Sequence, residues 1–205
     1  MAMENDVFRG RRAAPAANWF IGVALPPDAG WIHAAHDLPE GVRRFHPLDL
    51  HITVAFLGPC GEAKAHRAWA AMTSHGHPPV QAEAKAWHAL GHPHRPSAFG
   101  LVLGGGHSTL ADLMQRWGRD ALAAAGRPAE QRAPLPHVTL ARPSRRAGDQ
   151  ARMAMQRWIT HAPVPTAPAR LEHLALYTWA NPRHERLFQV VARRRLNDLQ
   201  LEAEV

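Results

Sequence analysis

The sequence predicts an α+β protein of two similar lobes, each with an antiparallel-type sheet and helices packed outside, facing each other across a central cleft. Eighteen prolines and fifteen glycines among 205 residues imply many short elements joined by turns. Strand and helix patterns alternate, and a strand-helix-strand theme occurs in each half. The same short pattern, His-x-Thr within an apolar strand, begins at His51 in the first half and at His137 in the second. These three observations together favour two related lobes.

The first half opens with an apolar run that predicts a buried strand and is stopped by Pro26-Pro27. Two prolines suit the first turn of a helix because that turn needs no backbone N–H donor. Gly58-Pro59 ends the next strand. The expected elements are a strand at 19–25, a helix from the prolines to about 38, a strand at 50–57, a helix at 62–74, and strands at 80–90 and 98–103 joined by the loop 91–96.

The second half begins with an amphipathic helix over 108–125, in which Leu110, Leu113 and Trp117 keep helical spacing. The remaining expected elements are a strand at 136–141, a helix at 149–159, two paired strands at 170–178 and 186–191, and a short helix or frayed tail from 193 onward. We expect residues 1–17 to form a flexible extension, 18–196 a single two-lobed domain and 197–205 a C-terminal tail.

The net charge and the cysteine content indicate which binding partners and which cellular compartment to expect. A formal net charge of +7 and a pI of about 11.1 favour polyanionic partners such as RNA, nucleotides or phosphorylated ligands, because a positive field concentrates them. The single cysteine, Cys60, excludes an intramolecular disulfide and favours a reducing cytoplasm. No apolar run approaches the ~18 residues that a membrane span needs, and we expect a monomer.

The two His-x-Thr strands carry the chemical signal. Successive side chains of a strand alternate between its faces, so His51 and Thr53 share one face, while Ile52, Val54 and Phe56 are expected on the other. By the same rule His137 and Thr139 project together, opposite Val138 and Leu140. Each strand therefore offers an imidazole beside a hydroxyl, with an apolar face to anchor it.

Two such strands facing one another suit a phosphodiester. One histidine, near its ordinary pKa of ~6.5, accepts a proton from water while the other protonates the departing ribose oxygen. The two threonine hydroxyls donate to the non-bridging phosphoryl oxygens. This scheme needs no metal and no cofactor, and no cluster of carboxylates in the sequence suggests a metal site.

The repetition of the motif makes it specific. With 15 histidines in 205 positions, chance gives about 0.24 matches to His-x-Thr followed by an apolar residue. Two matches, one in each half and each in a strand-like context, therefore indicate function more than they indicate ordinary surface histidines.

At these residues the sequence resembles the 2H phosphoesterase superfamily, and more narrowly the bacterial RNA 2′,3′-cyclic phosphodiesterases of the 2′-5′ RNA ligase family. The likeness extends from Trp19 to about Leu196. It includes the opening strand, the two His-x-Thr segments with their flanking residues, and the late strand that ends at Tyr177.

The resemblance implies a two-lobed fold with the active cleft between the lobes. It implies hydrolysis of a terminal 2′,3′-cyclic phosphate on RNA to a 2′-phosphate, with reversible 2′-5′ ligation as the related reaction. It also implies that His51 and His137 are catalytic and that Thr53 and Thr139 bind the phosphate. We expect His137 to be the base and His51 the acid, an order that the sequence alone does not fix.

Three further residues are weaker candidates for substrate binding. Arg142 leaves its strand on the parity opposite to His137 and Thr139, but the twist at the strand end could bring it to a phosphate. Phe45 is a candidate for stacking on the terminal base, with core packing as the alternative. Tyr177, the only tyrosine, either lines the cleft or is buried.

Two other functions stay open. One is a phosphodiesterase for small cyclic nucleotides or oligoadenylates, and the other is a non-catalytic module that binds RNA ends. A tight cleft with few basic groups outside it would favour small nucleotides. A basic track that leads away from it, to which Arg142, Arg145 and Arg146 would contribute, favours RNA.

Overall fold

The computed structural model describes residues 16–72, 76–144 and 148–198. The expectations for residues 1–15 and 199–205, and those for Arg145 and Arg146, lie outside the described residues. Ten strands, three 3-10 helices and three α-helices are assigned in the described part: β1 Trp19–Ala24, η1 Pro27–Ala29, η2 Trp31–Ala35, β2 Val42–Arg44, η3 Pro47–Asp49, β3 His51–Gly58, α1 Glu62–Ala71, β4 Val80–Ala82, β5 Ala84–His92, β6 Arg95–Leu103, α2 His107–Ala124, β7 His137–Pro143, α3 Asp149–Trp158, β8 Ala169–Leu171, β9 His173–Trp179 and β10 Phe188–Arg195.

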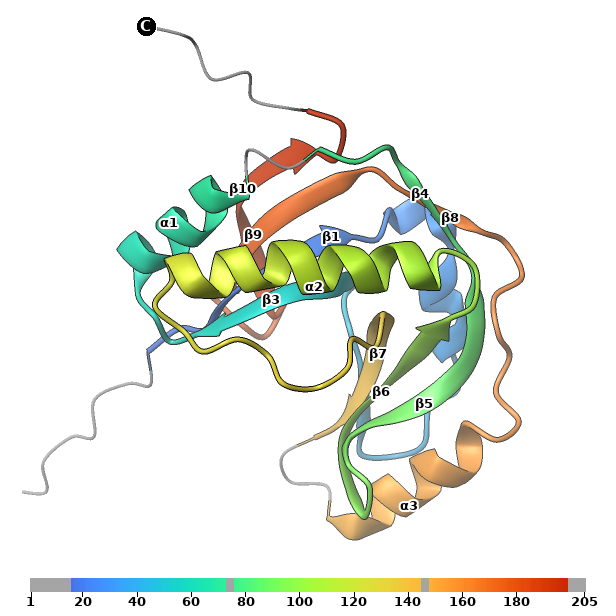
Figure 1. Ribbon diagram of the computed structural model, residues 1–205. Coiled ribbons are helices and arrows are strands. Elements are labelled where there is room, and N and C mark those ends of the chain that lie inside the picture. Colours follow the sequence, from blue (N-terminus) through green and yellow to red (C-terminus); the bar gives the residue numbers. More distant parts are fainter. Residues whose placement is uncertain (1–15, 73–75, 145–147, 199–205) are drawn as a thin grey trace, which may run out of the picture.

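Two four-stranded antiparallel sheets form the two lobes (Figure 1). Sheet A has the order β10-β9-β1-β3, and sheet B has the order β2-β7-β6-β5. A small third sheet pairs β4 with β8. The first His-x-Thr motif begins β3 and the second begins β7. The expected α+β fold, with one motif strand in each lobe, is therefore confirmed.

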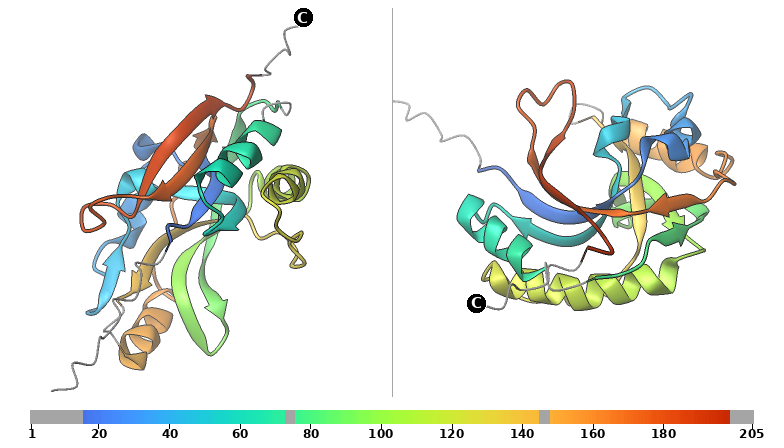
Figure 2. Two further views of the ribbon diagram at one scale, coloured as in Figure 1. Left: turned by 90° about the vertical axis from the view of Figure 1, so that its left-hand side faces the viewer. Right: turned by 90° about the horizontal axis from the view of Figure 1, so that it is seen from above.

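The helices cover the outer faces of the sheets. Helix α2 packs on β3 and on α1, and α3 contacts β2 and β6. Figure 2 shows α2 along one side of sheet A, while the loop between β9 and β10 rises on the opposite side. The amphipathic pattern explains the placement of α2, since Leu110, Leu113 and Trp117 are buried. None of the described helices has the length and apolar character of a membrane span.

The sheets exchange strands between the two halves of the chain, which sequence patterns did not predict. Sheet A combines β1 and β3 with the late strands β9 and β10, whereas β2 leaves the first half and pairs with β7 in sheet B. Strands β2, β4 and β8 have three residues each. Such short strands carry almost no periodicity, so only their tertiary pairing defines them.

Four expected elements were wrong. The strands expected at 80–90 and 170–178 are each divided into two, β4 and β5 in one case and β8 and β9 in the other. The helix expected from Pro27 to about residue 38 is two short 3-10 helices, because Gly30 adopts a left-handed conformation with φ of 71° and ends the first one. The tail expected from 193 onward is instead the end of β10, in which Arg193 and Arg195 pair with Ala175 and His173 of β9. The exposed arginines suit an edge strand, which tolerates charged side chains facing solvent.

Candidate active site

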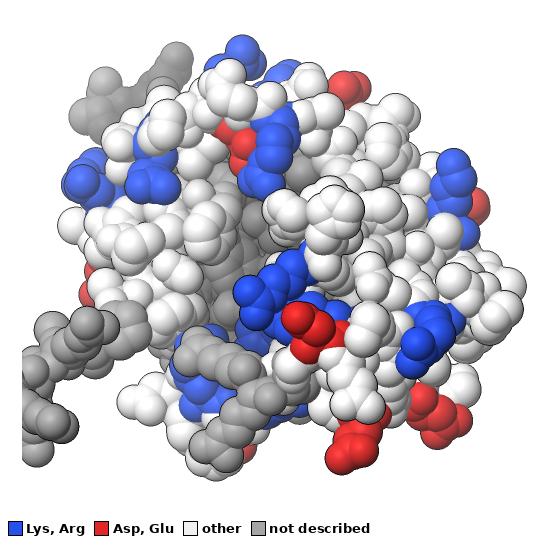
Figure 3. All heavy atoms as spheres, turned by 90° about the horizontal axis from the view of Figure 1, so that it is seen from below, with Lys and Arg blue, Asp and Glu red and all other residues white. Residues whose placement is uncertain are grey.

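The two motif strands lie near one another where the two sheets meet. Strand β3 forms one edge of sheet A, and β7 is the strand of sheet B in contact with it. The histidines that begin these strands are close enough for a positive charge on His137 to lower the pKa of His51. Figure 3, which shows the molecule from below, has a hollow bordered by Lys and Arg side chains.

Both motif strands contain a β-bulge at the same place. In β3 the register with β1 shifts so that Val54 is the extra residue between Thr53 and Ala55. In β7 the register with β6 shifts so that Leu140 is the extra residue between Thr139 and Ala141. A bulge inserts one residue into one strand and so inverts the alternation of faces beyond it.

The bulges correct the faces expected for Phe56 and Arg142. Simple alternation placed Phe56 opposite His51, but Phe56 pairs with Phe20, whose ring stacks on His51, and 55% of Phe56 is exposed. Beyond the Leu140 bulge, Ala141 is buried and Arg142 is partly exposed, as His137 and Thr139 are. Both side chains therefore share the face of their own motif, which a strictly alternating strand would not allow.

A glycine lies opposite each motif threonine. Gly22 of β1 pairs with Thr53, and Gly100 of β6 pairs with Thr139. A Cβ at Gly22 would lie 3.0 Å from the carbonyl oxygen of Ile52 and 3.2 Å from the ring of His51. A Cβ at Gly100 would overlap the carbonyl oxygen of Val138. The missing side chains let each bulged strand approach its neighbour and leave room for the imidazole of His51.

Aromatic rings surround His51. Its imidazole stacks on Phe20 with ring centroids 4.5 Å apart. The centroids of the Tyr177 ring and of the nearly perpendicular Phe188 ring lie 5.2 Å and 5.6 Å from that of the imidazole. This burial disfavours the charged imidazolium and lowers the pKa of His51 to about 4, against a smaller raising effect of its hydrogen bond to Asp49. His51 is therefore neutral at pH 7 in the free protein.

The pKa of His137 is also depressed, for related reasons. Burial lowers its pKa, the hydrogen bond to Leu135 opposes this, and a positive charge on His88 adds to the lowering. His88 of β5 pairs with Gly100, which in turn pairs with Thr139, so the three residues form one row across sheet B. A row of paired residues shares a face. His88 is thus a third histidine on the cleft face, and its place depends on strand register that no sequence motif signals.

The two motif histidines are held in the same way. Nδ1 of His51 lies 2.7 Å from the carbonyl oxygen of Asp49, and Nδ1 of His137 lies 2.7 Å from that of Leu135. A carbonyl oxygen only accepts, so Nδ1 carries the hydrogen in both rings and donates it. The neutral Nε2 atoms are then the acceptors that remain for chemistry.

Asp49 ties His51 to the loop between β9 and β10. Its carboxylate is completely buried and accepts hydrogen bonds from the backbone N–H groups of Leu187, at 2.7 Å, and Phe188, at 3.1 Å. The Arg186 guanidinium lies 3.8 Å from the same carboxylate. Phe188 in turn contacts the His51 ring. Sequence patterns did not single out Asp49, although its place two residues before the motif histidine could have done so.

The remaining candidates have mixed surroundings. Thr53 and Thr139 are half-buried on the faces of their histidines. Tyr177 is 1% exposed beneath the stacked Phe20 ring, and burial raises its pKa to about 12. Phe45 is 8% exposed, and the Arg142 guanidinium lies 5.6 Å above its ring. Tyr177 and Phe45 therefore pack beneath groups that face the cleft, which matches the core alternative for both.

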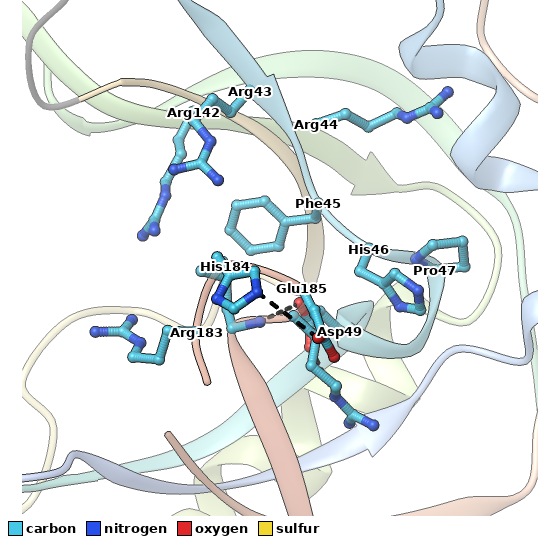
Figure 4. Close-up of a pocket in the computed structure, with 12 residues that line it drawn as sticks. Arg43, Arg44, Phe45, His46, Pro47, Asp49, Arg142, Arg183, His184 and Glu185 are labelled. Carbon is cyan, nitrogen blue, oxygen red and sulfur yellow. Dashed lines mark hydrogen bonds and ion pairs between the residues drawn. The ribbon is translucent and has the colours of Figure 1, made fainter. Parts of the chain in front are cut away.

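A cavity of about 340 Å³ opens between η3, the β2–β7 pair and the β9–β10 loop. Figure 4 shows Phe45 between Arg43 and Arg142 on one side and the loop residues Arg183 and His184 on the other. Asp49 lines it as well, so the cavity lies beside His51. In the described residues no three His, Cys, Asp or Glu side chains are arranged to hold a metal ion.

Solved structures with the same fold include a phosphoesterase and LigT. E. coli LigT complexed with 3′-AMP is 22% identical, with a TM-score of 0.65, and the match covers 87% of this chain and 97% of that one. A crystal structure described simply as that of a phosphoesterase is 21% identical, with a TM-score of 0.66 and coverage of 90% and 99%. The TT0787 protein of Thermus thermophilus is 18% identical, with a TM-score of 0.62 and coverage of 88% and 98%.

No protein-family model and no curated protein matches the sequence. The matches cover 87% and 90% of this chain and nearly all of each solved structure, so the chain has their two-lobed fold over that part of its length. At these sequence identities the likeness shows the fold and not the activity.

Proposed function

We propose that this chain is a phosphodiesterase that opens 2′,3′-cyclic phosphates on RNA ends, leaving a 2′-phosphate. His51 and His137 act as the acid–base pair, and Thr53 and Thr139 bind the phosphate. The observation that carries the proposal is the duplicated arrangement. In each motif Nδ1 of the histidine donates to the carbonyl two residues earlier, and a threonine follows on the same face. Two imidazoles and two hydroxyls meet the needs of the reaction without a metal or cofactor.

The chemical step follows from these groups. A water oxygen attacks phosphorus as Nε2 of His137 accepts the proton of that water. The bond from phosphorus to the ribose 3′ oxygen breaks, and this oxygen takes a proton from Nε2 of His51. The threonine hydroxyls donate to the non-bridging oxygens, where negative charge is held. With the 5′-hydroxyl of another RNA end in place of water, the same step joins the two ends by a 2′-5′ linkage, and its reverse cleaves that linkage.

The depressed pKa values suit the base better than the acid. A neutral His137 is ready to accept a proton at pH 7. His51, with a pKa of about 4 in the free protein, must gain a proton before it acts as the acid. An anionic phosphate beside an imidazolium raises its pKa, so we expect His51 to become protonated as the substrate binds.

Nucleotide ligands are consistent with this proposal. LigT has been crystallised with 3′-AMP, NADP+ and ATP, and the arginine-lined cavity beside His51 adds positive charge near the cleft. Basic groups outside the reacting centre favour an RNA end over a small cyclic nucleotide. Small cyclic nucleotides and a module that only binds RNA ends are the competing functions.

A hydrolysis assay tests the proposal. The purified protein, with EDTA present, is incubated with a short RNA ending in a 2′,3′-cyclic phosphate, beside a His137→Ala variant. We expect wild type to form the 2′-phosphate and the variant to be slower by about 10²–10⁴-fold, the usual contribution of a general acid or base. Binding without turnover would favour the binding module. Turnover of small cyclic nucleotides but not of RNA would favour the competing enzyme.

A further inference from the structure

Five arginines from three separate chain segments line the cavity beside His51. Arg43 and Arg44 belong to β2, Arg142 belongs to β7, and two more come from the loop 180–187. Figure 4 shows Arg43 and Arg142 extending side by side past Phe45, whereas Arg44 points away from them. The loop contributes Arg183, whose guanidinium lies 4.3 Å from the centre of the Trp179 ring, and Arg186.

Arg43 and Arg142 form a like-charged pair. They are direct cross-strand partners in the β2–β7 ladder. Like charges directly opposite each other destabilise a sheet, so this pairing has a cost in the unliganded protein. Arg142 is supported from below by the Phe45 ring. An anion bound between the two guanidinium groups would offset their repulsion.

The cavity holds more guanidinium groups than carboxylates. Asp49 is buried and accepts hydrogen bonds from Leu187 and Phe188 in addition to the nearby Arg186. Glu185 lies 3.7 Å from its neighbour His184. The lining residues therefore include five arginines and only these two acidic side chains. The excess charge is positive and suits a phosphate, which arginine binds with two parallel hydrogen bonds.

The four motif residues do not line the cavity, but residues on two sides of it, Arg142 and Asp49, connect it with the proposed reaction centre. Arg142 is three residues beyond Thr139 on the same face of β7, which corresponds to roughly 10 Å or less along a strand. On the other side, the Asp49 residue that lines the cavity also holds Nδ1 of His51. A ligand anchored by its terminal phosphate at the histidines can therefore extend into the cavity.

We propose that this cavity is a second phosphate site, which binds the phosphate on the 5′ side of the terminal nucleotide. The inference rests on the proposed function and specifies its substrate class. The preferred substrate is a nucleotide chain, or a nucleotide with a 5′-phosphate, rather than a nucleoside 2′,3′-cyclic phosphate. Arg43 and Arg183 are specificity residues in this assignment, and Arg142 lies between the two phosphates.

The test compares two substrates that differ only in the 5′-phosphate. Values of kcat/KM are measured for adenosine 2′,3′-cyclic phosphate and for its 5′-phosphorylated form, with wild type, Arg43→Gln and Arg183→Gln. Arg119→Gln, an exposed arginine on α2 outside the cavity, is the matched control for the charge change. We expect wild type to prefer the 5′-phosphorylated substrate by about tenfold or more, the effect of one charge-assisted hydrogen bond. The preference should fall towards one in both cavity variants and persist in the control.

A binding measurement separates this inference from the chemistry. Dissociation constants for adenosine 2′-phosphate and adenosine 2′,5′-bisphosphate are measured by calorimetry on the same four proteins, each checked for an unchanged thermal transition. Tighter binding of the bisphosphate that is lost in the cavity variants supports the second site even if no cyclic phosphate is hydrolysed, and in that case only the proposed reaction fails. If wild type hydrolyses both cyclic phosphates at equal rates and binds the two adenosine phosphates with equal affinity, the proposed second site is wrong, while the proposed reaction stands.

Discussion

His51 differs from an ordinary surface histidine in what surrounds it. Phe20, Tyr177 and Phe188 pack around the ring and leave it partly buried, and the carbonyl of Asp49 fixes its orientation. Because this burial lowers the pKa of His51 only in the folded protein, the protonation of His51 is linked to the stability of the fold.

The stability of the protein should therefore depend on pH through His51. The unfolded chain binds the proton near the ordinary pKa of 6.5, whereas the folded protein binds it only near 4. Unfolding is thus coupled to proton uptake, and the free energy of unfolding falls as the pH decreases from about 6.5 to about 4. A shift of this size corresponds to about 3 kcal/mol.

Urea unfolding of wild type and His51→Phe between pH 7 and pH 4 measures this contribution. Other titrating groups are common to both proteins and cancel in the difference. We expect wild type to lose about 3 kcal/mol more than the variant over this range, while the lost Asp49 hydrogen bond shifts the variant by a constant amount. If the free energy of unfolding depended on pH in the same way in both proteins, the depressed pKa of His51 would be contradicted.

At the level of single residues, the sequence predicts which side chains form the candidate site but not which side chains surround them. His51, Thr53, His137 and Thr139 follow from two short motifs, and the structure brings their strands together. The aromatic enclosure of His51 and the approach of His88 to His137 depend on pairing between strands distant in sequence. No local pattern encodes such pairing.

Among the elements, the two bulged strands determine what the cleft presents. Each motif strand bulges after its threonine, opposite a glycine of the neighbouring strand. The bulge turns Phe56 and Arg142 to the faces that carry the histidines, where strict alternation predicted the reverse. Sequence-based assignment of faces fails here because one inserted residue inverts every side chain that follows it.

Replacing the glycine opposite the second bulge should destabilise the protein. In Gly100→Ala the added Cβ would overlap the Val138 carbonyl oxygen, so β6 and β7 must separate. We expect a loss of about 2 kcal/mol or more in the free energy of unfolding. Gly104→Ala is the control, because its Cβ would make only ordinary contact with Lys85 at 3.5 Å. Equal thermal transitions for both variants would show that the close approach at Gly100 has no energetic weight.

The predictable elements were those with clear apolar periodicity and clear boundary residues. Strand β1, helix α2 and helix α3 follow closely the limits expected from apolar periodicity and from prolines and glycines. The helix expected after Pro26 failed because a left-handed Gly30 divides the segment. Strand β2 was missed, and β4 and β8 were merged with β5 and β9 into single expected strands, because three residues are too few for a separate period to show.

For the whole molecule, the net charge of +7 indicates a polyanionic partner. Five of the arginines line the cavity beside His51. Composition alone predicted a polyanionic partner, and the resemblance in the paired motifs predicted the two-lobed fold that the solved structures share. The exchange of strands between the halves could not be predicted, because it is a property of the assembled sheets.

Salt should distinguish long from short substrates. Each phosphate that the protein neutralises releases counterions, which gives a slope of about −0.7 in a plot of log kcat/KM against log salt concentration for a single strand. We expect an RNA oligonucleotide with a cyclic end to show a steeper slope than adenosine 2′,3′-cyclic phosphate by about 0.7 or more. Assays from about 50 to about 200 mM KCl, the range in which such effects are large, measure both. Identical slopes for the two substrates would indicate that the protein makes electrostatic contacts with the reacting phosphate alone.

The repeated bulges make the centre of the cleft nearly two-fold symmetric, with an imidazole and a hydroxyl contributed from each side. A symmetric centre by itself cannot distinguish between the two opposite directions in which a nucleotide chain could lie across it. The equivalent positions just beyond the bulges break this symmetry, since one lobe has the exposed ring of Phe56 and the other has the guanidinium of Arg142. A flat apolar surface suits a base, and a cation suits the sugar–phosphate backbone. For the proposed RNA substrate, we expect the direction of the nucleotide chain in the cleft to depend on the contrast between these two side chains, because each side offers the same imidazole and hydroxyl.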